Sequence, residues 1–423
     1  MTVNSNLNLS PSSRHSLTGG AWALFPALLL ISLAVPVELS ILIGDFRVSL
    51  SRLLLLLAAI PVMRKYMAAS RKKNYEYLLL GYIGWLFVSS FFNHGLEVSI
   101  ERAGSLGLEA LISFFVAAFG ITNVKRWIST VKVLVAVVFF IFPFVLVEAL
   151  IGKHFIHDFL SLLTGYIYPI PYEERLGLMR SSGPFNHPIL LGVFSATLIG
   201  MVWYGLYSRS LFKKAFCITL LIFNTLLSLS SAPVLLVFFQ VFAIAFNRIA
   251  GAYKSRWKAV IFCAAIIYFV LLVVSNRSPF MVILSRITLD PSTSFYRLLT
   301  WQYAGDSVIS HPFFGVGMNE WARPAWMITS SIDSFWLKTA VLYGIPAVVM
   351  LTLSTLILTG KVVKLMKASK IDAYRKLCVG WIVSIVSLVL LGFTVDFFGE
   401  IHIYFFFLLG MGASLVNMKD IRE

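Results

Sequence analysis

The sequence predicts an all-α polytopic membrane protein with about twelve transmembrane helices, and three observations favour this class. Of the 423 residues, 59% are hydrophobic and 13% are charged, a balance that would expose large apolar patches in a soluble protein. Apolar runs of about 20 residues, the length that crosses the hydrocarbon core of a bilayer, recur along the chain. Clusters of Lys and Arg separate alternate runs. We therefore expect one helical bundle with the bilayer as its solvent.

The apolar runs define the predicted spans in chain order. They cover residues 21–43, 48–63, 75–92, 104–122, 127–151, 188–206, 215–246, 259–275, 331–359, 377–394 and 401–417. As one helix the run at 215–246 would be about 48 Å long, which is too long for a single crossing. We expect it to turn at its SLSSAP segment, which gives twelve spans and places both termini on the same side.

The distribution of basic residues predicts the orientation, because Lys and Arg concentrate in cytoplasmic loops. With a cytoplasmic N-terminus, 24 of the 35 basic residues lie on the cytoplasmic side and 11 lie outside. The net charge of +16 thus reflects topology and does not indicate a nucleic-acid partner. The predicted layout is a cytoplasmic tail at 1–20, a single transmembrane domain at 21–417 and a cytoplasmic tail at 418–423.

Two long loops on the outer, periplasmic face are where we expect the functional site, at residues 152–188 and 276–330. Long ordered loops commonly carry function. The outer face has nine arginines and only two lysines, whereas the cytoplasmic loops are rich in lysine. Arginine keeps its charge and donates paired hydrogen bonds, so this bias favours a phosphate-bearing ligand.

The first loop ends in RSSGPFNHP, residues 180–188, which is typical of a tight turn at the membrane surface. Arg180 and His187 are its candidate functional residues. Two structural alternatives remain open at this point. Arg180 can extend to lipid phosphates, and His187 can cap the next helix.

The second loop predicts a helix that follows the PSTS segment and is capped by Ser292, Thr293 or Ser294. Arg297 and Trp301 share one face of this helix. It ends near HPFFGVG, where the proline stops it and two glycines allow the backbone to approach a ligand closely.

Three tryptophans of the second loop are candidates for stacking on sugar rings. Belts at the membrane interface are the commoner use of this residue type. The three are Trp301, Trp321 and Trp326.

Several other chemistries have no signature in the chain. It contains no Asp-x-Asp pair, no GxxxxGK loop, no CxxC and no His-Glu-x-x-His, and His154 and His157 lack a third ligand nearby. We expect neither a metal nor a cofactor. Glu38, Glu109 and Glu148 lie in or near spans, where a carboxylate is either functional or wetted at a helix end.

The second half of the chain resembles the O-antigen ligase and polymerase superfamily of bacterial surface-polysaccharide assembly. The resemblance rests on RSSGPFNHPILLG, the break at SLSSAP, SFYRLLTWQYAGDSVISHPFFGVG and SIDSFWLKTAVLYGIPA, in that order. The Asp-Ser pair before Phe-Trp-Leu is most similar to exopolysaccharide repeat-unit polymerases. The resemblance implies a metal-independent glycosyltransferase of the bacterial inner membrane. Its substrate would be an undecaprenyl-diphosphate-linked oligosaccharide, polymerised at the periplasmic face.

The resemblance also suggests which residues act. The departing diphosphate needs cations, and four arginines of the outer loops are the candidates. They are Arg180, Arg286, Arg297 and Arg323. Family ligases usually have an arginine at the break between the seventh and eighth spans, where this chain has Ala232, so another arginine must replace it.

The acceptor hydroxyl needs a base, and the usual histidine of the ligases is absent because Asp333 and Ser334 stand where they have His-Asn. Asp333 is therefore the predicted base or acceptor-orienting group, and His311 is the second choice. An N-cap role for Asp333 at the tenth span is equally open. The missing histidine favours a polymerase over a ligase that acts on lipid A core.

A transporter or flippase of lipid-linked sugars is the alternative from another class. Such proteins commonly show internal repeats, and none is evident here. The expected partners are the lipid-linked oligosaccharide, membrane lipids, a chain-length regulator and export machinery.

Overall fold

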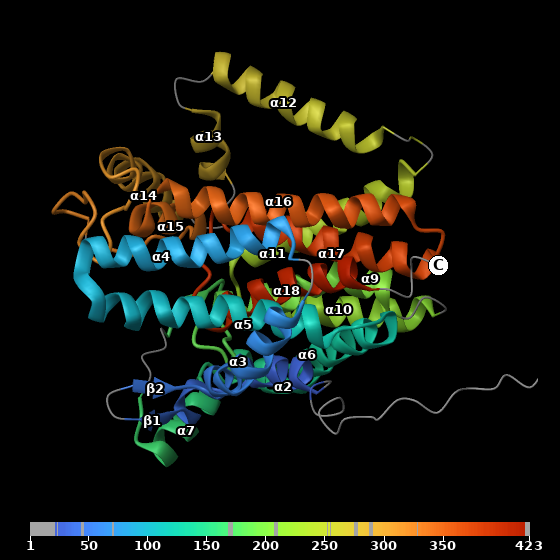
Figure 1. Ribbon diagram of the computed structural model, residues 1–423, viewed down its shortest axis with the longest axis horizontal. Helices are drawn as coiled ribbons and strands as arrows, with labels where there is room; N and C mark the ends of the chain where they lie inside the picture. The colour runs from blue at the N-terminus through green and yellow to red at the C-terminus, as the bar shows by residue number, and fades with distance from the viewer. Residues whose placement is uncertain are drawn as a thin grey trace, which may run out of the picture.

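The computed structural model is a polytopic, mostly helical chain, as the sequence predicts. It describes residues 22, 24–43, 46–69, 72–167, 172–206, 210–251, 253, 255–274, 278–286, 291–327 and 329–418. Within these residues, eight helical segments are long and apolar enough to cross a membrane. The longest, Asn74–Gly120, contains two helices that lie side by side and are joined by a π-helical turn (Figure 1). The count of twelve crossings stays a prediction.

The described elements follow the predicted spans and loops in order. The helices before the first long loop are α2 (Phe25–Ser32), α3 (Leu50–Ala68), α4 (Asn74–Val98), α5 (Gly104–Gly120) and α6 (Val124–Ile151), with the short turns η1 (Val37–Leu39) and η2 (Ser99–Ala103). The later helices are α7 (Phe155–Thr164), α8 (Pro188–Ala196), α9 (Leu198–Gly205), α10 (Leu211–Leu227), α11 (Ser231–Ile249), α12 (Arg256–Val274), α13 (Pro279–Arg286), α14 (Pro291–Ser310), α15 (Phe335–Tyr343), α16 (Ile345–Ala368), α17 (Asp372–Leu391) and α18 (Glu400–Asn417). Two small antiparallel hairpins pair β1 (Ile41–Ile43) with β2 (Phe46–Val48) and β3 (Glu174–Arg175) with β4 (Leu178–Met179).

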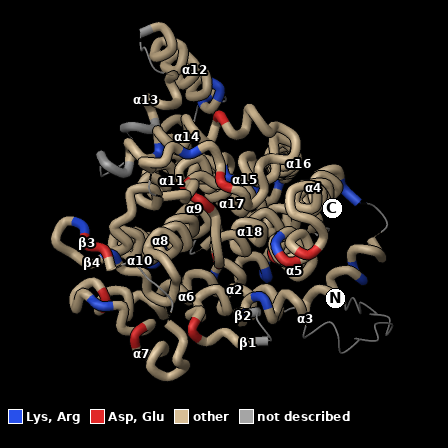
Figure 2. The backbone as a smooth tube through the Cα atoms, turned by 90° about the vertical axis from the view of Figure 1, so that its left-hand side faces the viewer, with Lys and Arg blue, Asp and Glu red and all other residues tan. Residues whose placement is uncertain are grey.

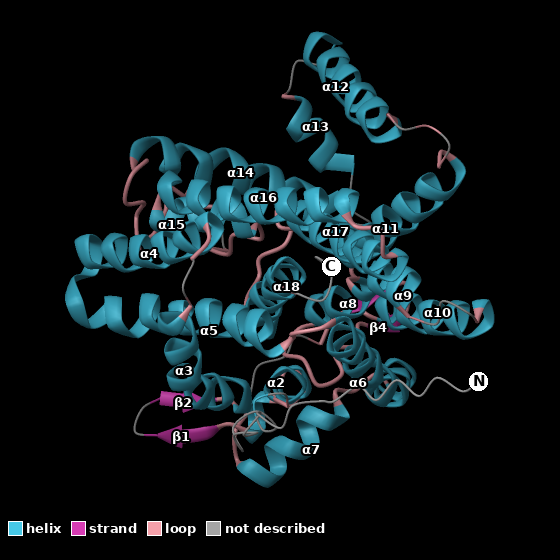
Figure 3. Cartoon of the chain, turned by 45° about the vertical axis from the view of Figure 1, so that its right-hand side comes forward, coloured by secondary structure: helices cyan, strands magenta, loops and turns pink. Residues whose placement is uncertain are grey.

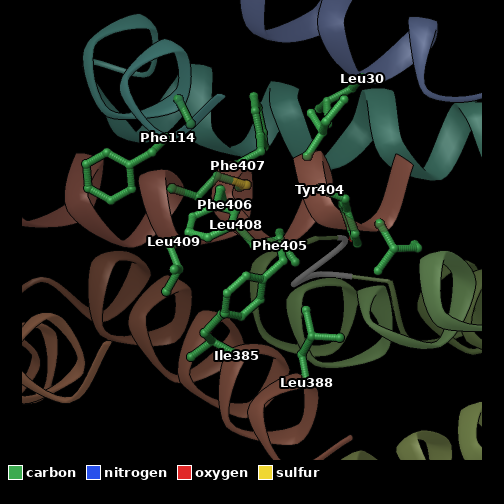
Figure 4. Close-up of a cluster of buried hydrophobic side chains, with 14 of the residues drawn as sticks. Leu30, Phe114, Ile385, Leu388, Tyr404, Phe405, Phe406, Phe407, Leu408 and Leu409 are labelled. Carbon is green, nitrogen blue, oxygen red and sulfur yellow. The ribbon is translucent and has the colours of Figure 1, made fainter. Parts of the chain in front are cut away.

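Helix α18 lies at the centre of the bundle. Its sequence EIHIYFFFLLGMGASLVN is apolar on nearly every side, and almost all of its side chains are buried. Figure 4 shows Phe406 and its neighbours on this helix among side chains such as Phe114 of α5 and Ile385 of α17. Gly410 lets α5 come close, because a Cβ there would lie 2.1 Å from the carbonyl oxygen of Phe114. The other helices are thus arranged around α18, which they bury almost completely.

The first predicted span, 21–43, is wrong as one continuous helix. Helix α2 has eight residues and rises only about 12 Å, well short of the hydrocarbon thickness. After it the chain passes through Pro36, which is not helical, into η1 and the β1–β2 hairpin. Hydropathy could not reveal this, since the residues of the turn and the hairpin are as apolar as those of a spanning helix.

The predicted break in the long run 215–246 is confirmed. Helix α10 ends at Leu227 and α11 begins at Ser231, so the turn falls in the SLSSAP segment. Leu229 takes a left-handed conformation there, with φ of 44°. This conformation is unusual for a non-glycine residue and is stabilised only by its surroundings.

The predicted tenth span, 331–359, is divided into α15 and α16 at Gly344. The φ of Gly344 is 84°, and a Cβ on it would lie 1.8 Å from the carbonyl oxygen of Phe313. The HPFFGVG segment fills this break, because Val316 N–H donates to the carbonyl of Val341 at 2.8 Å. Gly315 makes the contact possible. The expectation that these glycines approach a ligand is therefore wrong, since they approach the end of the chain's own helix α15, whose carbonyls lack helical partners.

The second long loop contains helices α13 and α14. The predicted helix after PSTS exists, but it begins at Pro291, so Ser292, Thr293 and Ser294 lie inside it and do not cap it. Proline is favoured in the first turn of a helix because its missing N–H is not needed there. The predicted end before Pro312 is confirmed. Helix α12 stands away from the bundle together with α13 (Figures 1 and 3).

Two ends of the bundle differ in their basic residues. Where α4 begins and α18 ends, Lys73 donates to the side chain of Asn417, and Lys361 lies 5.0 Å from the ring centroid of Tyr75. The opposite end is viewed in Figure 2, where α14, α15 and the β3–β4 hairpin lie. The basic residues of that hairpin and of α14 are arginines, Arg175 and Arg297. The lysine-rich and arginine-rich groups predicted for opposite faces are thus separated in space.

Candidate functional site

The two long loops meet at the end of the bundle where α15 begins. The electrostatic neighbours of Arg297 are Asp333 and Arg175, and those of His187 include Arg180 and Asp333. The first loop supplies Arg175, Arg180 and His187, and the second loop and its approach to α15 supply Arg297 and Asp333. We call these five residues the cation cluster. Three residues predicted from separate motifs, Arg180, Arg297 and Asp333, are therefore brought together.

Arg180 is held rigidly beneath the surface, with 3% of its area exposed. Its Nη1 forms an ion pair with Glu173, and its Nη2 donates to Ser230 Oγ at 2.8 Å. Burial lowers the pKa of Arg180 and nearby Arg175 lowers it further, while Glu173 opposes both. The guanidinium nevertheless remains charged at any working pH. Arg180 therefore contributes a fixed positive charge, and the alternative that it extends into lipid headgroups is wrong.

The first long loop packs against the break between α10 and α11. Ser181 N–H donates to the carbonyl of Leu227 at 3.1 Å, and Arg175 Nη1 donates to the carbonyl of Leu229 at 3.4 Å. These contacts stabilise the left-handed conformation of Leu229. The break thus positions both arginines, although it lacks an arginine of its own.

Glu148 orients the turn that carries Arg180. Its carboxylate accepts the backbone N–H groups of Ser182 at 2.9 Å and Gly183 at 2.8 Å, and it also pairs with His154. Hydrogen bonds from backbone amides to a carboxylate are strong because the acceptor is charged. Glu148 is therefore neither a wetted helix end nor a free acid, and it fixes the loop in place.

Arg297 has the least satisfied guanidinium of the cluster. It lies on α14 with 7% of its area exposed, and its Nε and Nη1 have no hydrogen-bond partner within the described part of the chain. Burial lowers the pKa of Arg297, whereas the carboxylate of Asp333 raises it. A buried donor without a partner costs about 1–3 kcal/mol. This arrangement leaves two donor nitrogens ready for an anionic ligand.

Asp333 is the exposed carboxylate of the cluster. Ser331 Oγ donates to its Oδ1 at 2.9 Å. It does not cap α15, because Ser334 is the N-cap and its Oγ accepts the N–H of Leu337 at 3.3 Å. The N-cap alternative for Asp333 is therefore wrong, and its exposed carboxylate is an electrostatic neighbour of the buried Arg297.

His187 caps helix α8, as one alternative predicted. Its Nδ1 accepts the N–H of Ile189 at 3.1 Å, so in the neutral ring the hydrogen is on Nε2. Burial and Arg180 lower the pKa of His187 to about 4, although Glu173 and Asp333 oppose them. At neutral pH the residue is therefore an uncharged hydrogen-bond donor.

His311 and Arg323 lie apart from the contacts that define the cluster. His311 follows the end of α14, fourteen residues after Arg297, which corresponds to about 21 Å along the helix axis. Arg323 pairs with Glu320 at 3.0 Å and donates to the carbonyl of Met327. These described contacts of Arg323 are all within its own loop.

The three tryptophans differ in their surroundings. Trp321 is buried in a small core beside α14 and α15, and its Nε1 donates to the carbonyl of Ser330 at 3.0 Å. Trp301 packs edge-on against Phe280 and is half-buried. Trp326 is 57% exposed. Only Trp326 has most of its ring open, so a stacking role fits it better than Trp321.

The side chain of one predicted residue is not described, and two charged residues at the cluster were missed. The side chain of Arg286, at the end of α13, is not among those described. The prediction omitted Arg175 and Glu173. Arg175 stands only five positions before Arg180 in the arginine-bearing loop, so the excess of arginine over lysine could have pointed to it. No pattern in the sequence marks Glu173 as the partner of Arg180.

The comparisons with known proteins give distant likenesses among solved structures. No protein-family model and no curated protein sequence matches the chain. A chain in a solved structure described as "Structural coordination of polymerization and crosslinking by a peptidoglycan synthase complex" is similar, with a TM-score of 0.45 and 15% sequence identity. The match covers 84% of this chain and 99% of that chain. At this level of similarity, function has to be inferred from the side chains of this chain.

Proposed function

We propose that the chain is a glycosyltransferase that polymerises lipid-diphosphate-linked oligosaccharide repeat units at the periplasmic face of the bacterial inner membrane. The observation that supports this most directly is Arg297, which is buried beside the open carboxylate of Asp333 with two unpartnered donors. A diphosphate supplies the oxygens that these donors lack. The undecaprenyl carrier and the exopolysaccharide or O-antigen product come from the family resemblance.

In the proposed reaction, Asp333 acts on the acceptor, and Arg180 and Arg297 act on the donor. The acceptor hydroxyl oxygen attacks C1 of the donor saccharide, the bond from C1 to the diphosphate oxygen breaks, and the lipid diphosphate departs with the electron pair. Asp333 accepts the proton of the attacking hydroxyl. Arg180 and Arg297 stabilise the charge that develops on the departing diphosphate.

The protein environment favours this chemistry over simple headgroup binding. Arg180 is held beneath the surface by the α10–α11 break and by the turn that Glu148 fixes, so it does not have to reorganise as charge develops. An exposed base beside fixed cations is what a transfer reaction requires. A site that only recognised headgroups would gain nothing from placing the carboxylate of Asp333 there, because it repels the phosphate.

Deleting the protein and inspecting the lipid-linked pool tests the proposal. A polymerase mutant should accumulate single repeat units exposed on the periplasmic side, and Asp333→Asn should give the same pool. Full-length lipid-linked polymer would instead indicate a ligase. Repeat units trapped in the cytoplasmic leaflet would indicate a flippase, and either of these two results would overturn the proposal.

A further inference from the structure

A cavity of about 600 Å³ lies next to the cation cluster, on the other side of helix α15. The start of α3, the η2 turn, α5, α15 and the loop before α18 form its walls. Its volume falls in the range of about 300–1,000 Å³ that is usual for ligand pockets. None of the residues in the proposed transfer step lines it, so it is a separate compartment. We call it the charge-balanced cavity.

The formal charges of its lining cancel. Three cations and three carboxylates line it, and four of these six are joined in ion pairs. Arg52 Nε lies 2.8 Å from Glu109 Oε1, and Lys338 Nζ lies 2.5 Å from Asp396 Oδ2. Glu109 is also 3.2 Å from His402 Nδ1. The other two charged residues are Glu101 and Arg102.

This balance indicates the kind of ligand that would fit. A phosphate or a uronic acid would need surplus positive charge, and a cation would need surplus carboxylate. Paired ions in fixed positions instead offer both donors and acceptors, and hydroxyl groups use both. Stacked rings add an apolar wall, with the centroids of Phe335 and Phe397 4.7 Å apart. A neutral, polyhydroxylated molecule meets all of these conditions.

The lining of the cavity comes close to the cation cluster near the start of α15. Asp333 precedes α15, whereas Phe335 and Lys338 on the same helix line the cavity. Phe398 also lines it, and its ring centroid lies 5.9 Å from that of His187. A ligand in the cavity would therefore end close to the base.

We infer that the charge-balanced cavity binds a short stretch of neutral glycan. Its assignment as the acceptor, whose terminal hydroxyl reaches Asp333, rests on the proposed function. The binding of neutral glycan by the cavity does not.

The test uses the full-length protein in detergent and two probes. The first is the saccharide that mild acid releases from the lipid-linked pool of cells lacking the protein, and the second is inorganic diphosphate. Ser105→Trp places a large ring in the cavity from a half-buried position, and Ser105→Ala is the matched control that removes the hydroxyl without filling space. Arg102→Met is a second variant, because among the described residues Arg102 is in no salt bridge and should not be needed for folding.

We expect Ser105→Trp to weaken saccharide binding at least tenfold and Arg102→Met to weaken it several-fold, with diphosphate binding unchanged in both. Arg297→Gln should do the reverse. Saccharide binding that is absent in the wild type or unaffected by Ser105→Trp would overturn the inference. Release of a bound phospholipid by Ser105→Trp, with saccharide binding unchanged, would assign the cavity to lipid and would also overturn it. Loss of the diphosphate response alone would count against the proposed function and leave the cavity assignment standing.

Discussion

The cation cluster and the charge-balanced cavity share helix α15 but treat charge in opposite ways. In the cavity, Arg52 and Lys338 are each paired with a carboxylate within 2.8 Å. In the cluster, Arg297 is buried with Nε and Nη1 unpartnered among the described residues. A paired network is complete without a ligand, whereas an unpartnered buried cation becomes satisfied only when an anion binds. The difference supports the proposed diphosphate chemistry at the cluster and the proposed recognition of a neutral ligand in the cavity.

The largest expected effect comes from Asp333→Asn, which removes the proposed base and keeps the shape of the side chain. We expect polymer synthesis to fall by about 10²–10⁴-fold, the usual contribution of a general base. Folding should be unaffected because Ser334 caps α15. Polymer yield in complemented deletion cells measures the effect. Glu320→Gln is the control, since this acid is exposed in the same loop, and equal losses in both variants would remove Asp333 from the chemistry.

Arg297→Lys is expected to be nearly as severe. Lysine keeps the charge but loses the planar fork that donates paired hydrogen bonds, so we expect a loss of about 10²–10³-fold in polymer yield and weaker diphosphate binding. Arg323→Lys is the matched control, because the described contacts of Arg323 lie in its own loop. Near-normal polymer in Arg297→Lys would remove the phosphate role and with it the contrast between the two regions.

The sequence predicts the members of the cation cluster better than the residues that hold them in place. Arg180 and Asp333 lie near the ends of apolar runs and Arg297 lies in the long loop between two runs. Loops on the same side of a membrane can meet, so the convergence of these residues was predictable. The partners of Arg180 were not. Glu173 and Ser230 come from different segments, and only the packing of the first loop on the α10–α11 break shows which polar groups face each other.

Hydropathy predicts spans well where lipid or dry core surrounds a helix on every side. The predicted span 127–151 became α6, and 401–417 became α18, each within three residues. It fails where irregular backbone carries an apolar sequence, as in the exposed β1–β2 hairpin and at the break at Gly344, because the apolar composition is the same as in a helix. The glycines of HPFFGVG show a related limit of sequence analysis. A glycine indicates that another group can approach the backbone closely, but it does not indicate whether that group is a ligand or, as here, the end of helix α15.

Gly344→Ala should disturb both regions together, unlike the variants above. The left-handed backbone at Gly344 costs a residue with a Cβ about 1–3 kcal/mol, and the clash with the carbonyl of Phe313 adds to this. We expect a lower unfolding temperature in detergent and weaker binding of both diphosphate and saccharide, because α15 would move. Gly360→Ala on α16 is the control, since a Cβ there meets nothing within 4 Å and favours the helix. Loss of only one binding activity in Gly344→Ala would show that α15 does not couple the two regions.

The smallest expected effect concerns His187, whose pKa is lowered to about 4 from an ordinary value of 6.5. Between these values the unfolded chain binds a proton that the folded chain does not, so the free energy of unfolding falls as pH falls through this window. At pH 7 both states are neutral and the effect vanishes. The contribution is at most about 3 kcal/mol.

His187→Asn tests this contribution, because asparagine can still accept the N–H of Ile189 as an N-cap. The drop in unfolding temperature from pH 7 to pH 4.5 should be smaller in His187→Asn than in the wild type. His311→Asn is the control at an exposed histidine and should keep the full drop. An undiminished drop in His187→Asn would mean that His187 is protonated in the folded protein. The ring would then add a positive charge to the cation cluster and sharpen its contrast with the cavity.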